Sequence, residues 1–165
     1  MHSHKKLLNI AALRPGRNGG NPQAANDVTF TAAIDGTAQC YVQLLPEGFD
    51  SSREHHVLIA LHGHGSDRWQ YVRDPRDECR AARDFADKWN MIFVSPDYRA
   101  KTSWMGPKAE ADLAQIIAKL RRDYRVGRVF LAGGSMGGSA ALTFAARHPD
   151  QVAGVSSEAR DDSVC

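Results

Sequence analysis

The chain has 165 residues, a length that predicts one domain, and 42% of them are hydrophobic and 24% charged, as in ordinary soluble globular proteins. The formal net charge at pH 7 is +2, but Lys5, Lys6, Arg14 and Arg17 place a basic excess near the amino terminus. The rest of the chain is slightly acidic, which argues against a nucleic-acid partner bound through a basic surface.

The cysteines and the apolar segments exclude further classes of protein. Cys40, Cys79 and Cys165 are odd in number and widely spaced, so the sequence predicts no disulfide framework, no zinc site and no cofactor. The apolar segment Leu7–Leu13 is too short to span a membrane and is not followed by a small-residue cleavage pattern. We therefore expect a cytoplasmic protein with no membrane partner.

The order of the predicted elements indicates an α/β fold. Residues 1–27 are expected to form a basic, flexible tail, and residues 28–165 one domain. Alternating residues over 28–45, with a turn at Asp35-Gly36, predict a hairpin. Apolar runs predict strands over 57–61, 91–95, 128–132 and 152–155, and helical spacing predicts helices from Asp74-Pro75 to Trp89, over 113–124 and over 139–147. Repeated strand–helix units predict a mostly parallel sheet with helices on both faces.

The segment from Gly133 to Gly138 carries the strongest functional signal. Gly133-Gly134-Ser135-Met136-Gly137 fits the pattern G-x-S-x-G, and it lies between an apolar strand and a predicted helix, as a nucleophile elbow requires. Small residues on both sides allow the tight turn, and Ser135 would stand at the positive end of the helix dipole. We interpret Ser135 as a nucleophile.

Two other segments are expected to meet Ser135 at the carboxyl ends of the strands. His62–Asp67 follows one buried strand, and Pro96–Trp104 follows the next. In an open α/β sheet, ligands bind at this edge. We expect the three segments to line one crevice, with Tyr98, Trp104 and Trp69 as candidates for its walls.

With these motifs, the sequence resembles the α/β-hydrolase superfamily, and within it the serine esterases related to polyhydroxybutyrate depolymerases and to feruloyl and acetylxylan esterases. The resemblance covers residues 28–156 and is carried by four motifs: Leu61-His62-Gly63-His64-Gly65, Ser95-Pro96-Asp97-Tyr98, the Ser135 elbow, and Ala146-Arg147-His148-Pro149-Asp150.

The resemblance implies a carboxylesterase that acts on a small-molecule ester through an acyl-Ser135 intermediate. It also implies an oxyanion hole made by the backbone N–H groups of Met136 and of a residue after the earlier strand, with His64 favoured over Gly63 and Gly65. His62 is expected to brace this loop by hydrogen bonding.

A metal-dependent hydrolase is the alternative from another class. His62 and His64 form a His-x-His pair at a strand end, and Asp67 could join them as a ligand. Except for Asp97, no further ligand cluster follows the later strands, and the glycines around the pair suit a backbone turn better than a rigid ligand set.

The general base of a serine hydrolase is missing from the pattern. The acid and the histidine should follow Ser135 in that order, but His148 is the one histidine that does, and it would lie about 18 Å away along the predicted helix. Asp161 and Asp162 are candidates for the acid. We therefore expect residues 28–165 to be an incomplete, C-terminally truncated hydrolase domain. The base is then His64 or a residue of another copy; alternatively, the chain is an inactive fragment or pseudoenzyme.

Overall fold

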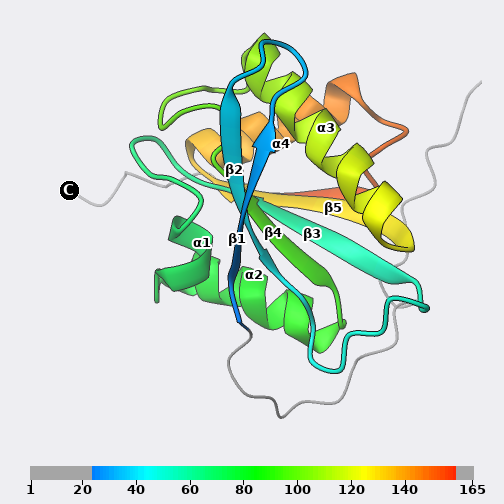
Figure 1. Ribbon diagram of the computed structural model, residues 1–165. Helices are drawn as coiled ribbons and strands as arrows, with labels where there is room; N and C mark the ends of the chain where they lie inside the picture. The colour runs from blue at the N-terminus through cyan, green and yellow to red at the C-terminus, as the bar shows by residue number, and fades with distance from the viewer. Residues whose placement is uncertain (1–23, 159–165) are drawn as a thin grey trace, which may run out of the picture.

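The computed structural model describes residues 24–158, which form one six-stranded sheet with helices on both sides (Figure 1). The strands are β1 (Asn26–Thr31), β2 (Ala38–Leu44), β3 (His55–Leu61), β4 (Ile92–Pro96), β5 (Val126–Gly134) and β6 (Gly154–Glu158). The helices are α1 (Gln70–Arg73), α2 (Asp77–Lys88), α3 (Pro107–Asp123) and α4 (Met136–Arg147).

The sheet has the strand order β1-β2-β4-β3-β5-β6. Strands β4, β3, β5 and β6 run parallel to one another, and the β1–β2 hairpin joins this group through an antiparallel pairing of β2 with β4. The pairing aligns Leu61 with Gly133 and Gly133 with Ser157, so β3, β5 and β6 end at the same edge. The predicted α/β class with a mostly parallel sheet is confirmed.

Both faces of the sheet are covered, which explains why its central strands are apolar throughout. In β3, Ile59 points into a core shared with α3 and α4, whereas the adjacent Leu58 points into a second core shared with α1 and α2. Alternate residues of a strand face opposite sides, so each face is filled by its own set. Figure 1 shows α2 and α3 on opposite sides of the sheet.

Several boundaries differ from the prediction, including the start of α3, which lies at Pro107 instead of residue 113. Helix α2 begins at Asp77, because Asp74 instead ends the unpredicted short helix α1: its N–H donates to the carbonyl of Gln70, and its carboxylate binds Arg76. Strand β1 begins at Asn26, inside the segment assigned to the tail. Strand β6 begins at Gly154, two residues later than predicted, and just before it the N–H of Ala153 donates to the carbonyl oxygen of Val129.

Two expectations fall on residues that the structure does not describe. The greater part of the predicted tail, residues 1–23, lies outside the described range, as do Asp161 and Asp162. Among residues 24–158, no helix is both long enough and apolar enough to cross a membrane.

Candidate active site

Ser135 is the single residue between the end of β5 and the start of α4. Its backbone has φ 54° and ψ −122°, a combination that residues with a side chain rarely adopt. The Ser135 N–H donates to the carbonyl oxygen of Glu158 at 3.0 Å, which ties the turn to β6. The side chain is exposed, so the strained turn presents its hydroxyl to solvent at the amino end of a helix.

The glycines around Ser135 are required by close backbone contacts. A Cβ atom on Gly137 would collide with the carbonyl oxygen of Leu61 in the neighbouring strand, and one on Gly133 would collide with the backbone of Gly137. A Cβ on Gly138 would lie 2.6 Å from the hydroxyl of Ser157. The first turn of α4 therefore packs directly against β3, β5 and β6, and this contact fixes Ser135 at the sheet edge.

The loop after β3 is braced by its buried histidine, as expected. The ring nitrogens of His62 lie 2.8 Å from the carbonyl oxygen of Gly63 and 3.2 Å from that of Asp97. Tyr98, itself buried, donates its hydroxyl to the carbonyl oxygen of His62 at 2.6 Å. His62 is thus a structural residue that connects the loops after β3 and β4.

The hydrogen bonds of this loop distinguish among the three candidate oxyanion donors. The N–H of Gly63 donates to Oε1 of Gln70 at 2.8 Å, and that of Gly65 donates to the carbonyl of Lys101 at 2.8 Å. Among residues 24–158, no acceptor takes the N–H of His64. The N–H of Met136, at the first position of α4, has no acceptor within the helix.

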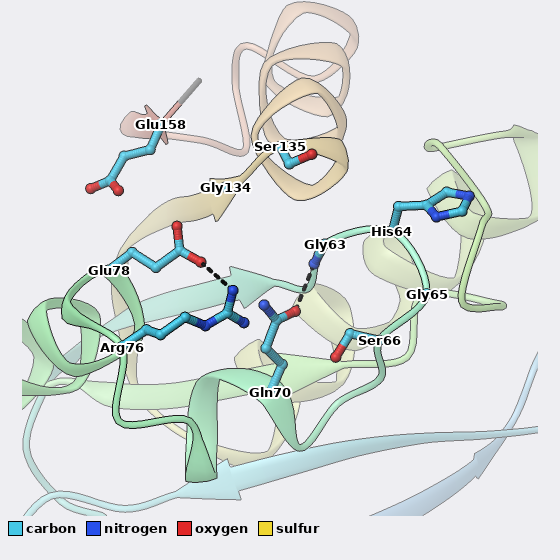
Figure 2. A pocket seen from close by; sticks show the side chains of 10 residues that line it. All are labelled: Gly63, His64, Gly65, Ser66, Gln70, Arg76, Glu78, Gly134, Ser135 and Glu158. Carbon is cyan, nitrogen blue, oxygen red and sulfur yellow. Dashed lines mark hydrogen bonds and ion pairs between the residues drawn. The ribbon is translucent and has the colours of Figure 1, made fainter. Parts of the chain in front are cut away.

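A pocket of about 590 Å³ lies between the loop after β3 and the turn at Ser135 (Figure 2). It is lined by residues of the loop after β3, of α1 and α2, and of the ends of β5 and β6: Gly63, His64, Gly65, Ser66, Gln70, Arg76, Glu78, Gly134, Ser135 and Glu158. Of the three segments expected to form one crevice, two line this pocket. The third, Pro96–Trp104, contacts the His62 loop but contributes no residue to the lining.

The pocket has an acidic end that sequence reasoning missed. The Glu78 carboxylate covers Gly134 and lies 4.0 Å from the guanidinium of Arg76, whose principal partner is Asp74. The hydrogen bond from Arg76 lowers the pKa of Asp74. Figure 2 shows the Ser135 hydroxyl turned away from the carboxylates of Glu78 and Glu158. In the sequence, Glu78 looks like an ordinary acidic residue in the first turn of a helix, so no local signal marks it.

The five histidines of residues 24–158 do not supply a base to Ser135. The imidazole of His64 extends away from Ser135 (Figure 2), and its ring lies 6.2 Å from that of Trp104. His148, at the far end of α4, binds Glu110 at 2.8 Å. The ring nitrogens of the remaining three bind backbone groups instead of the Ser135 hydroxyl: His55, His56 and His62. The position of His64 therefore suits a backbone role better than that of a base.

The metal alternative finds no assembled ligand set. Both ring nitrogens of His62 face carbonyl oxygens, so neither is directed at the same point as His64. Within residues 24–158, no three side chains of His, Cys, Asp or Glu are grouped so that they could hold a metal ion.

The chain is similar to serine hydrolases and esterases. A family model described as serine aminopeptidase, S33, matches residues 108–158, which include the Ser135 elbow. Feruloyl esterase C of Emericella nidulans is 24% identical over 144 residues, which cover 84% of this chain and 53% of that protein.

Solved structures with the same fold include a serine hydrolase and an esterase. A fluorophosphonate-binding serine hydrolase of Staphylococcus aureus matches with a TM-score of 0.66 and 22% identity, over 82% of this chain and 56% of that one. A ferulic acid esterase of Anaeromyces mucronatus matches with a TM-score of 0.64 and 21% identity, over 87% of this chain and 61% of that one. The chain thus spans a little more than half the length of these relatives.

Proposed function

We propose that this chain, by fold and ancestry a serine esterase-type α/β-hydrolase, contributes the nucleophile and the oxyanion hole for hydrolysis of a small-molecule carboxylic ester. The observation that carries the proposal is the exposed Ser135 hydroxyl, held by a strained turn at the amino end of α4 and opposite the His62–Gly65 loop. Strain of this kind gathers at functional sites and costs about 1–3 kcal/mol.

In the proposed reaction, Oγ of Ser135 attacks the ester carbonyl carbon and gives up its proton to a base. The carbonyl oxygen becomes an oxyanion, which accepts hydrogen bonds from the N–H groups of Met136 and His64. The alcohol leaves with a proton, and the resulting acyl-Ser135 ester is then hydrolysed by water. Because none of the described histidines contacts the Ser135 hydroxyl, the base in this scheme lies outside residues 24–158.

The same geometry supports a second candidate, a chain that no longer turns over. Among the described residues, no hydrogen-bond partner engages the Ser135 hydroxyl, and a serine without a base is a weak nucleophile. In that case Ser135 remains correctly placed but reacts slowly, and the chain is an inactive relative of the esterases.

Labelling and turnover test the proposal together. We expect an alkyl fluorophosphonate probe to label the full chain, and 4-nitrophenyl acetate to be hydrolysed, with both signals lost in Ser135→Ala. Ser139→Ala is the matched control, because Ser139 is exposed one turn later on α4 and should behave like the unmodified chain.

Slow labelling without turnover would identify the inactive relative. Hydrolysis that survives Ser135→Ala but stops in the presence of a chelator would replace the serine mechanism with a metal-dependent one.

A further inference from the structure

The loop from Asp97 to Gly106, between β4 and α3, holds an unusual share of the backbone strain in the molecule. Among residues 24–158, six residues other than glycine have positive φ, and four of them lie in this loop: Tyr98, Arg99, Trp104 and Met105. Ser135 is one of the other two. Such conformations persist only where the surrounding structure enforces them, and they mark functional sites more often than neutral ones.

Polar contacts within this loop and to three neighbouring segments hold it in place. The carbonyl of Lys101 accepts the N–H of Gly65 at 2.8 Å, and the hydroxyl of Ser103 donates to the carbonyl of Tyr98 at 2.8 Å. Arg99 forms ion pairs with the buried Asp112 at 2.8 Å and with Asp35 at 3.0 Å. The loop is therefore fixed to both α3 and the hairpin.

Trp104 is the one aromatic side chain that this rigid loop leaves in solvent. Its neighbours in the loop that could bury apolar surface do so, since Tyr98 is 1% and Met105 5% exposed, but Trp104 is 54% exposed. A φ of 47° at Trp104 stores strain without gaining burial. Stability alone does not explain a strained and exposed tryptophan.

Trp104 lies beside a residue that lines the pocket of Ser135. Its ring lies 6.2 Å from the ring of His64, at an angle of 49°. His64 lines the pocket that contains Ser135, and its imidazole extends from the pocket toward the side away from Ser135. Trp104 does not line the pocket itself, but its ring lies beside that of His64, the proposed oxyanion donor, which does.

We propose that Trp104, together with the ring of His64, forms an aromatic rim that contacts a flat, unsaturated group of the ester and so determines substrate preference. The proposal rests on the ester hydrolysis proposed above. A planar group that extends from Ser135 past His64 would stack on Trp104, and stacked aromatic pairs gain attraction beyond the burial of apolar area. Trp104 is a specificity residue here, since the bond-forming steps occur at Ser135.

Binding to a chain that cannot react tests the rim separately from catalysis. In a Ser135→Ala background, ligand-observed NMR would measure the affinities of phenyl acetate and cyclohexyl acetate, which match in size but differ in flatness. We expect tighter binding of the phenyl ester, and we expect Trp104→Ala to weaken that binding by about three- to tenfold while changing cyclohexyl acetate less.

Two further variants control the experiment. Trp104→Phe should retain most of the preference, and Ile34→Ala, an apolar side chain 48% exposed in the hairpin turn, should leave both affinities unchanged. Equal losses for the two esters, no loss in Trp104→Ala, or no detectable binding of either ester would each overturn the rim. If the flat ester is preferred but the unmodified chain takes no fluorophosphonate label, the proposed function fails while the rim stands.

Discussion

The two ends of α4 use polar side chains for opposite purposes. At the amino end, the Ser135 hydroxyl is exposed on a strained turn, with no hydrogen-bond partner among the described residues. At the carboxyl end, His148 stacks on Phe144 at 4.3 Å, and its ring binds Glu110, which also pairs with Arg147. The side chains of His148 and Glu110 are paired with each other, and their pairing stabilises the fold. Within residues 24–158, the Ser135 hydroxyl is left unpaired on a strained turn, so it remains available for reaction.

The largest effect expected from this comparison concerns the N–H of His64, opposite the amino end of α4. His64→Pro removes that N–H, and losing one of the two proposed oxyanion donors should slow fluorophosphonate labelling by about 10²–10³-fold. His64→Ala keeps the N–H and should label at close to the normal rate with a small alkyl probe. Labelling rates, with thermal melts to confirm folding, measure both variants, and equal slowing in the two would assign the role to the imidazole.

Close packing at the amino end of α4 gives the next effect. Gly137→Ala would drive a Cβ into the Leu61 carbonyl, which neither helix nor strand can move away from easily, so we expect a loss of about 3 kcal/mol or more in the free energy of unfolding. Urea denaturation measures this loss.

Gly106→Ala is the comparison for that variant. Its Cβ would meet its nearest neighbour, the Ser103 carbonyl, at 3.5 Å, an ordinary contact, and the cost should stay below about 1 kcal/mol. Similar losses at the two sites would show that the elbow is less tightly packed than the structure indicates.

Relief of the backbone strain at Ser135 should raise the free energy of unfolding by a measurable amount. Ser135→Gly relieves the positive φ, and after the entropy cost of glycine we expect the chain to gain about 1 kcal/mol while losing all labelling. Ser139→Gly, one turn into the same helix, should lose about 0.5 kcal/mol instead. A loss in both variants would mean that the turn at Ser135 carries no strain.

The sequence was sufficient for the strands, for the three longer helices and for the elbow because their signals are local. Continuous apolar runs mark the central strands, and glycines at fixed offsets from Ser135 reflect contacts between consecutive segments. The start of α2 was predicted too early because Asp74-Pro75 resembles a helix start. In the structure the N–H of Asp74 donates to Gln70 of α1, and its carboxylate accepts a hydrogen bond from Arg76.

The acidic end of the pocket could not be predicted for a different reason. Glu78 and Glu158 are 80 positions apart in numbering and reach the same pocket only through the packing of α2 against the sheet and the pairing of β6 with β5. The bracing role of His62 was predictable because the glycines around it suit a backbone turn better than a rigid metal-ligand set. Whether His64 acts through its N–H or its ring depends on the direction of one side chain, which no sequence pattern records.

The smallest expected effect lies at the carboxyl end of α4. The hydrogen bond from Arg147 lowers the pKa of Glu110 below its ordinary 4.5, and the hydrogen bond from His148 lowers it further by a smaller amount. A carboxyl whose pKa is lowered by folding stabilises the folded state above its unfolded pKa, and this contribution disappears as the pH falls through the folded pKa.

Glu110→Gln should therefore cost up to about 1 kcal/mol at pH 7, and the difference from the unmodified chain should shrink steadily below pH 4.5. Glu47→Gln, in the exposed loop after β2, should change stability little at either pH. Urea denaturation across this pH range measures both. A cost for Glu110→Gln that is the same at every pH would show that Glu110 contributes through packing, and the contrast between the two ends of α4 would then not rest on paired charge.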